Sequence, residues 1–273
     1  MKDTRLCKLQ PSYLDLGEGD PQLLLADQDQ PPKLIESLRR TLSADEIERA
    51  SRFRFERDRL HFTVARGILR QILGDLLKIE AGRVRFRYSE YGKPSLSAEF
   101  DSSRLKFNIS HSGGRLLMAF AIGREIGVDI EHIRPDFATH DIAERFFSAS
   151  EVQRLRSLPS AFHAEAFFNC WTRKEAYIKA IGEGLSCPLD KFDVTLVPGE
   201  PARLLATRVQ GLSADRWVMR SLDAGESYKA AMVVERACRD GNDGKPEDIP
   251  SHEASGGEPG DDLQVPWVRV EAD

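Results

Sequence analysis

Ile126-Gly-Val-Asp-Ile-Glu131 is the stretch on which the expected fold depends. Its apolar residues indicate a buried β-strand that carries two carboxylates at positions i and i+2. Because strand side chains alternate between two faces, Asp129 and Glu131 point to one side, and Val128 and Ile130 point to the other. Like charges on one strand face repel each other unless a cation lies between them. The pair therefore indicates either a metal site or the solvent face of an edge strand.

Some forty residues later, Trp171-Thr-Arg-Lys-Glu-Ala-Tyr-Ile-Lys179 has the pattern of a helix. At about 100° per residue, an apolar stripe on this helix is formed by Ala164, Phe168, Trp171 and Ile178. Glu175 falls inside the stripe and Lys179 falls at its edge. An exposed Glu–Lys pair at this spacing would add only a few tenths of a kcal/mol, but a core-facing carboxylate costs free energy unless it is paired or bound to metal. Three converging carboxylates with a nearby lysine would suit a divalent metal ion that carries a phosphorylated ligand.

The composition is that of an ordinary globular protein of 273 residues with a formal net charge of −5. Residues 240–262 alone carry a net charge of −7, so the remainder, at +2, is not basic enough to suggest nucleic-acid binding. The four cysteines form no CxxC pair, which argues against a zinc site or a disulfide scaffold and fits a reducing cytoplasm. No apolar run approaches the length needed to cross a membrane, so no membrane association is expected.

Two capping boxes, Ser43–Glu46 and Ser148–Glu151, lie 105 residues apart, and each predicts the start of a helix. The recurrence suggests an internal duplication, with an N-terminal α/β half at residues 1–112 and a C-terminal half at 113–236. The acidic tail, 237–273, is expected to be disordered, although its apolar end could dock back. Other predicted elements are a helix at 59–78, a long helix after the second box, and strands at 13–16, 84–88, 105–110, 116–122, 126–130, 191–196, 204–208, 217–222 and 228–234.

Several other residues have both a plain and a functional interpretation. Ser110-His111 ends a strand before a glycine turn; it could contact a phosphate or nucleotide, although an ordinary strand-end histidine is the simpler interpretation. A serine hydrolase is disfavoured because no nucleophile-elbow pattern is present. Glu151 is the capping-box acid and, as a secondary hypothesis, a general base. Lys93 and Arg49 would be solvated surface charges unless a phosphate site lies nearby.

Five motifs in one order resemble those of the 4′-phosphopantetheinyl transferases, in particular the larger monomeric class named after surfactin synthetase activation. They are Tyr91-Gly-Lys-Pro94, Phe107-Asn-Ile-Ser-His-Ser112, Gly127-Val-Asp-Ile-Glu131, Phe146-Phe-Ser-Ala-Ser-Glu151 and Trp171–Lys179, followed by Gly182-Glu-Gly-Leu185. The resemblance covers roughly residues 40 to 195.

The resemblance implies an α+β fold of two similar α/β halves, a pseudo-dimer with the active site in the cleft between them. It implies a cytoplasmic, monomeric enzyme that moves the phosphopantetheine arm of coenzyme A onto a serine of an apo carrier protein, acyl, polyketide or peptidyl. Adenosine 3′,5′-bisphosphate would be released. By motif position, Mg²⁺ would be held on the pyrophosphate by Asp129, Glu131 and Glu175.

The same resemblance assigns the remaining site residues. Ser110 and His111 would contact the 3′-phosphate and adenine, and Lys179 would hold the pyrophosphate. The other assignments are coenzyme A contacts from Arg49, Lys93 and Pro94, and Glu151 as a candidate base. Some members of the family have a further basic residue where this chain has His61. Oxygen-only ligands favour a hard cation over zinc.

Two other functions remain possible from the sequence. A metal-dependent phosphohydrolase would cleave nucleotides with water and would need no carrier. A non-catalytic module that binds nucleotides or carriers would not need Glu175 and Lys179 together, so their joint presence argues against it.

Overall fold

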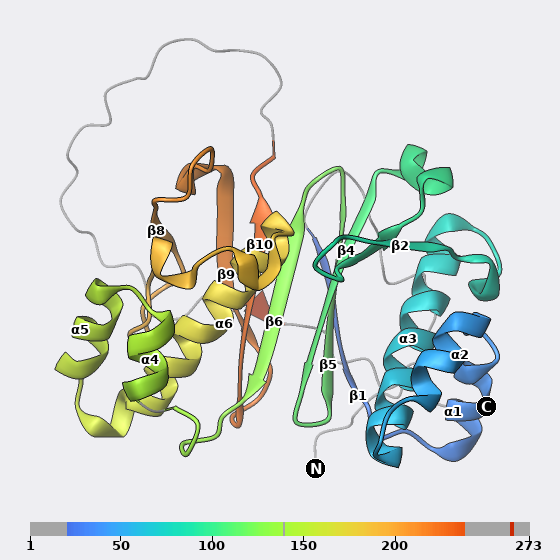
Figure 1. The fold of residues 1–273 in the computed structure, drawn as a ribbon, viewed down its shortest axis with the longest axis horizontal. Coiled ribbons are helices and arrows are strands. Elements are labelled where there is room, and N and C mark those ends of the chain that lie inside the picture. Colours follow the sequence, from blue (N-terminus) through green and yellow to red (C-terminus); the bar gives the residue numbers. More distant parts are fainter. Residues whose placement is uncertain (1–20, 139, 238–262, 265–273) are drawn as a thin grey trace, which may run out of the picture.

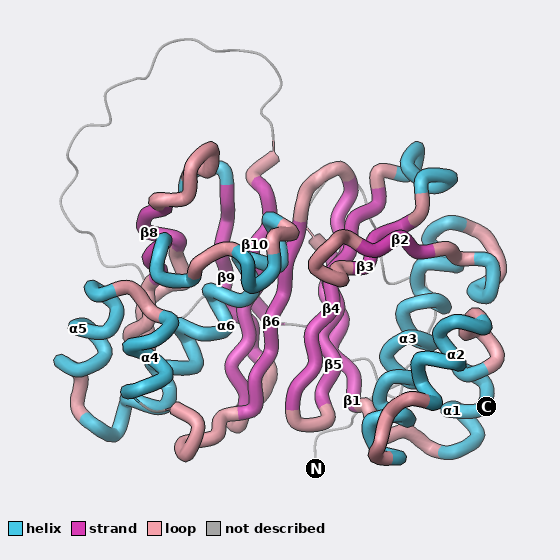
Figure 2. Tube along the Cα trace, in the orientation of Figure 1, coloured by secondary structure: helices cyan, strands magenta, loops and turns pink. Residues whose placement is uncertain are grey.

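The structure, a computed structural model, describes residues 21–138, 140–237 and 263–264, with the backbone alone at Leu185, Leu263 and Gln264. Two sheets, antiparallel except for one short parallel strand at the edge of the second, lie next to each other in the middle of the molecule, and helices cover the two ends of the molecule (Figure 1; Figure 2). Each half combines an antiparallel arrangement of strands with a long helix. The predicted α+β fold of two α/β halves is therefore confirmed.

The N-terminal half packs helix α3 against a three-stranded sheet of order β1-β5-β4. Its elements are β1 (Gln22–Asp27), α1 (Pro32–Arg39), α2 (Ala44–Ser51), α3 (Glu56–Leu77), β2 (Phe86–Tyr88), β3 (Pro94–Leu96), β4 (Leu105–Ser112) and β5 (Arg115–Ile122). The first predicted capping box forms, with the Ser43 backbone N–H donating to Glu46 at 3.0 Å. The predicted helix at 59–78 is α3, which begins three residues earlier. Of the expected strand at 84–88, only β2 forms, and the strand expected at 13–16 lies outside the described residues.

The C-terminal half packs helix α6 against strands β9 and β10. Its elements are β6 (Ile126–His132), α4 (His140–Phe146), α5 (Ala149–Ser157), α6 (His163–Ile181), β7 (Phe192–Val194), β8 (Leu204–Thr207), β9 (Trp217–Asp223), β10 (Tyr228–Glu235) and β11 (Leu263–Gln264). The second capping box starts α5, but α5 has nine residues and ends before Pro159, so the long helix expected there is wrong. The strand expected at 204–208 does form, but β8 pairs with β7 in a separate ribbon rather than in the main sheet, whose order is β11-β9-β10-β6.

The chain changes from one sheet to the other at residues 123–125. The expected division at residue 112 falls at the β4–β5 hairpin, and both of those strands belong to the first sheet. Ile126, which begins β6, is the first residue of the second sheet. Of the acidic tail, only Ala237 and β11 are described; β11 runs parallel to β9, and the expected disorder concerns residues outside the described range.

Strands β4 and β6 meet through side chains rather than through a backbone ladder. The edge of β6 that faces away from β10 has backbone N–H groups that need acceptors. Alternate residues of β4 supply them. The bonds run from Val128 N to the Asn108 amide oxygen (2.9 Å), from Ile130 N to Ser110 Oγ (3.3 Å) and from His132 N to Ser112 Oγ (3.2 Å). This seam fixes the position of one half against the other.

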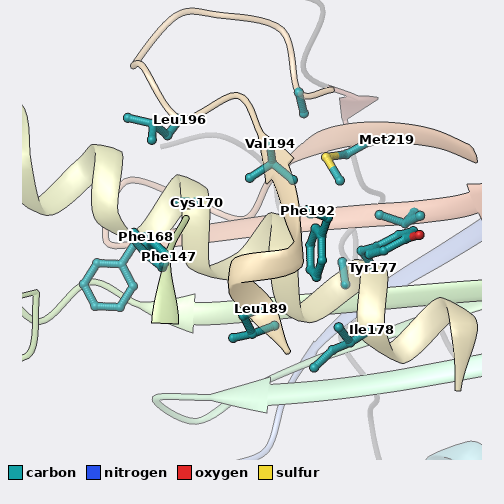
Figure 3. Close-up of a cluster of buried hydrophobic side chains, with 14 of the residues drawn as sticks. Phe147, Phe168, Cys170, Tyr177, Ile178, Leu189, Phe192, Val194, Leu196 and Met219 are labelled. Atoms are coloured by element: carbon teal, nitrogen blue, oxygen red, sulfur yellow. The ribbon is translucent and has the colours of Figure 1, made fainter. Parts of the chain in front are cut away.

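Gly127 lets helix α6 lie directly on β6. A Cβ atom at this position would collide with the carbonyl oxygen of Ala176 and the backbone nitrogen of Ala180. The apolar residues of α6 pack into the C-terminal core, where Phe168, Tyr177 and Ile178 are buried with Phe192 and Met219 (Figure 3). The glycine of the Gly-Val-Asp motif therefore brings the helix that carries Glu175 and Lys179 against the strand that carries Asp129.

Candidate functional site

The two carboxylates of β6 lie at the seam between the halves. Asp129 is 3% exposed, and its Oδ1 accepts a hydrogen bond from Ser110 Oγ at 2.8 Å. Glu131 Oε2 accepts one from Ser112 Oγ at 2.6 Å. The two serines of β4 thus repeat the i, i+2 spacing of the two acids on β6. The alternative interpretation, a solvent-facing edge strand, is wrong for Asp129.

Helix α6 brings a lysine and a third carboxylate to this seam. Lys179 Nζ lies 2.6 Å from Asp129 Oδ1 and 3.0 Å from Ser110 Oγ. Glu175, one turn earlier, is partly buried and lies close enough to Asp129, Glu131 and Lys179 to interact with their charges. The structure therefore brings together all four of the charged residues that were expected to surround the pyrophosphate.

The electrostatics of the cluster favour bound cations. Burial, reinforced by the charge of Asp129, raises the pKa of Glu175 to about 7, although Lys179 opposes the shift. Burial also raises the pKa of Glu131, against the hydrogen bond from Ser112. Three carboxylates thus share a low-dielectric site with the ammonium of Lys179. A further cation would stabilise their charged forms.

Asp129 provides the test of whether these residues fit a metal ion. Its second oxygen, Oδ2, is buried and has no hydrogen-bond partner among the described residues. A buried acceptor without a partner is costly, and a hard cation is the natural partner for carboxylate oxygens. In the described part of the chain no three acidic, histidine or cysteine side chains are already arranged to hold a metal. Lys179 occupies Asp129 Oδ1 instead, so a metal would require the cluster to rearrange around Oδ2.

A cavity of about 470 Å³ lies beside the seam in the N-terminal half. Arg49, Pro94 and His111, three of the expected coenzyme A contacts, line it. Burial, and then the charge of Lys179, lowers the pKa of His111, which favours its neutral form. Most of the remaining side chains are cations, rings and apolar groups, including Arg57, His61, Arg66, Phe53, Phe62, Tyr88 and Ile109, and the lining also contains Asp58 and Gln28. This mixture suits an aromatic base that carries a phosphate.

Sequence reasoning missed Arg57 and Arg66 as cavity residues. Arg57 lies in the first turn of α3, where it looks like an ordinary surface charge. Arg66 follows Phe62 by four residues, so helical spacing places it beside the apolar stripe of α3. That position, on a face otherwise made of core residues, was the available signal.

Lys93 does not line the cavity. Its Nζ donates to the carbonyl oxygens of Lys179 (2.6 Å) and Ala180 (3.4 Å), at the C-terminal end of α6. Burial lowers its pKa. A cation is favourable at a helix C-terminus because the last carbonyls have no partners within the helix. In this structure Lys93 therefore joins the two halves through the helix that carries Lys179.

Glu151 lies apart from the carboxylate cluster. It is 3% exposed, and each of its oxygens accepts a backbone hydrogen bond at 2.8 Å, Oε2 from Ser148 N and Oε1 from Val194 N. Lys174 Nζ also lies 2.8 Å from Oε2. These contacts confirm the capping-box interpretation. A carboxylate enclosed in this way has no oxygen available to a substrate hydroxyl, so its position does not support the role of general base.

The chain matches known protein families in both halves. A family model described as the 4′-phosphopantetheinyl transferase superfamily matches residues 125–233. A second, described as 4′-phosphopantetheinyl transferase, N-terminal, matches residues 31–134. The first match begins where the chain enters the second sheet. Among the described helices, none is long and apolar enough to cross a membrane.

Curated relatives cover much of the chain. It is 41% identical over 224 residues to the 4′-phosphopantetheinyl transferase HetI of Nostoc sp. (strain PCC 7120). The aligned region covers 82% of this chain and 91% of HetI. It is 33% identical over 193 residues to a 4′-phosphopantetheinyl transferase of Bacillus subtilis, with 71% of this chain and 82% of the relative aligned. For Sfp of Bacillus subtilis (strain 168) the identity is 34% over 155 residues, with 57% and 66% aligned.

Proposed function

We propose, from the premise that this chain belongs to the 4′-phosphopantetheinyl transferase superfamily, that the seam between β4, β6 and α6 is its catalytic centre. The protein is an enzyme that transfers phosphopantetheine to carrier proteins. The observation that supports this location best is buried Asp129, whose Oδ2 lacks a partner while Oδ1 is held by Ser110 and Lys179.

In the reaction, a carrier serine oxygen attacks the phosphorus next to the pantetheine arm of coenzyme A. The bond from that phosphorus to the bridging pyrophosphate oxygen breaks, and adenosine 3′,5′-bisphosphate leaves. The serine loses its proton to a base or to solvent. The product is a phosphodiester between the carrier and the arm. One P–O bond forms as one breaks, so the number of atoms and the total charge are conserved.

Asp129, Glu131 and Glu175 fit a magnesium ion by their chemistry, because all their donors are oxygens and one buried oxygen needs a partner. When bound, Mg²⁺ would neutralise charge on the pyrophosphate and reduce its repulsion of the incoming hydroxyl. Ser110 and Ser112 hold two of the three carboxylates in orientation through their hydroxyl donors.

The cations around the seam would position the nucleotide. The Lys179 ammonium donates a hydrogen bond to Asp129 Oδ1. It would neutralise charge on the pyrophosphate as the leaving group gains charge. Arg49 and His111 line the adjacent cavity, where the adenine and 3′-phosphate would lie. Electrostatic stabilisation of this kind is the main protein contribution to phosphoryl transfer.

Transfer is tested by incubating the protein with coenzyme A, Mg²⁺ and an apo carrier, and measuring the carrier mass. We expect one arm to be added to one serine, and no addition when that serine is replaced by alanine. Running fatty-acid, polyketide and nonribosomal-peptide carriers in parallel identifies the class of partner. No addition to any of them would contradict the proposal.

The same experiment without carrier separates transfer from hydrolysis. A phosphohydrolase would release adenosine 3′,5′-bisphosphate at a similar rate whether or not the carrier is present. We expect release to depend on the carrier. The proposed monomeric state is checked by light scattering coupled to size-exclusion chromatography.

A further inference from the structure

Helix α3 carries two buried arginines four residues apart, Arg66 and Arg70, which face one carboxylate, Glu46. Arg70 is fully satisfied. Its Nε lies 2.6 Å from Glu46 Oε2, and its Nη1 donates to the carbonyl oxygens of Ala81 (3.1 Å) and Val84 (3.0 Å). Arg70 is 1% exposed and holds α3 against the turn that follows it.

Arg66 has no equivalent set of partners. Its Nε lies 3.4 Å from Glu46 Oε1, and its Nη1 is buried without a hydrogen-bond partner among the described residues. The guanidinium lies 4.8 Å from the ring centre of Phe86 and 5.8 Å from that of Phe62. Only 5% of the residue is exposed, yet it forms part of the wall of the 470 Å³ cavity.

The charges around Arg66 do not balance. Glu46 provides the one buried negative charge for two buried guanidiniums. The exposed carboxylate of Asp45 also acts on both guanidiniums, and Arg49 adds a third positive charge nearby. Burial lowers the pKa of Arg66, but a guanidinium remains protonated in proteins. A buried charge without a full counter-charge is expensive. A fold retains such a group at low cost when a ligand supplies the missing negative charge.

We propose that Arg66 is a binding residue for the phosphate monoester at the nucleotide end of the substrate, the 3′-phosphate of coenzyme A. This inference rests on the proposed function and adds to it the residue that distinguishes coenzyme A from its 3′-dephospho form. Arg49 and Arg57 lie on the same cavity wall. Arg66 differs from them because it is desolvated before the ligand arrives, so it loses little hydration when the phosphate binds.

The test compares the affinities for coenzyme A and 3′-dephospho-coenzyme A by calorimetry in the wild type, Arg66→Met and Arg66→Lys. We expect Arg66→Met to weaken coenzyme A binding by about 10- to 100-fold, the value of a charge-assisted hydrogen-bond pair. Binding of the dephospho form should hardly change, so the preference for the phosphate is lost. Arg66→Lys should keep part of it, because lysine retains the charge without the fork of donors.

Arg87→Met is the matched control. Arg87 lies on β2 next to Phe86, is exposed, and pairs with Asp101 at 3.1 Å without lining the cavity. Its removal takes away one positive charge from the same region and should leave the preference for coenzyme A over its 3′-dephospho form intact. A second readout is the melting temperature without ligand. We expect Arg66→Met without ligand to melt at the wild-type temperature or above. When coenzyme A is added, its melting temperature should rise by less than that of the wild type.

Two results would overturn the inference. One is an unchanged preference in Arg66→Met. The other is an equal loss of affinity for both ligands, which would show that Arg66 only shapes the cavity. Failure of the proposed function is distinguishable, because it would appear as no arm transfer by the wild-type protein. Transfer by the wild type together with an unchanged preference in Arg66→Met would reject the role of Arg66 alone.

Discussion

Helix α6 carries the lysines of two lysine–carboxylate pairs, which differ in how completely their donors and acceptors are satisfied. Lys174 and Glu151 have side chains 0% and 3% exposed, and both carboxylate oxygens also accept backbone bonds. Lys174 further donates to the carbonyl oxygens of Leu189 and Phe192. In the second pair, Lys179 is 27% exposed, and Asp129 keeps one oxygen without a partner.

The difference separates a structural pair from the pair that we propose to be functional. A buried pair whose donors and acceptors are all used fixes the packing of α5, α6 and β7, and it has nothing to offer a ligand. A pair with a spare oxygen, an accessible ammonium and two nearby carboxylates of raised pKa can exchange its partners. The satisfaction of hydrogen bonds and the exposure of the ammonium distinguish the two pairs, whereas their charges do not.

The largest expected effect comes from Asp129→Asn. Losing a ligand to the proposed metal should reduce the rate of arm transfer by about 10³-fold, since Lewis-acid stabilisation amounts to several kcal/mol. The fold should persist, because asparagine can still accept from Ser110. Carrier mass measured over time gives the rate, and circular dichroism checks the fold. A rate near that of the wild type would place the catalytic centre elsewhere.

Glu151→Gln should act on stability instead. It leaves the ammonium of Lys174 buried without a counter-charge, which costs about 3–5 kcal/mol. Urea unfolding measures this loss. Turnover per folded molecule, measured at a temperature where the variant remains native, should stay close to that of the wild type. A stable variant that has lost turnover would instead restore Glu151 as the general base.

Glu175 should make the stability of the ligand-free protein depend on pH. Its pKa, about 7 in the folded state against 4.5 in its unperturbed state, means that the folded protein binds more protons between these values. The contribution of Glu175 to stability is therefore greatest below pH 4.5 and falls as pH rises to about 7, by up to about 3 kcal/mol. Unfolding in EDTA from pH 5 to 8 measures the slope. Glu175→Gln should remove most of it, and an unchanged slope would exclude Glu175 as its origin.

Lys179→Met should produce the smallest and most diagnostic change. Without the ammonium, Asp129 Oδ1 keeps only the hydrogen bond from Ser110, so Mn²⁺ in the absence of coenzyme A should bind up to about fivefold more tightly, the value of a partly exposed ion pair. Electron paramagnetic resonance of free Mn²⁺ gives the affinity. Arm transfer should nevertheless fall, because the pyrophosphate loses its lysine. Weaker Mn²⁺ binding would show that Lys179 supports the metal site rather than competing with it.

Local rules predicted much of this molecule. Short, largely apolar runs identified β4, β5 and β6, helical periodicity identified α3 and α6, and the capping boxes located the starts of α2 and α5. These signals concern residues within a few positions of one another, where the spacing in sequence fixes the direction in which each side chain points. Long-range pairing was not available from these signals: β8 pairs with β7 instead of joining the main sheet, and the chain passes from one sheet to the other at residues 123–125.

The candidate site shows the same division between what local sequence determines and what long-range contacts determine. The sequence by itself determined that Asp129 and Glu131 share a face, that Glu175 precedes Lys179 by one helical turn, and that the motifs follow the order of the family. Only the tertiary structure decided that Ser110 holds Asp129, that Lys93 caps α6, and that Arg66 shares its one carboxylate with Arg70. A sequence gives the charge of each side chain, but the number of its partners depends on segments far apart in the chain. In this protein, the count of partners distinguishes the groups that hold the fold together from those left available to a ligand.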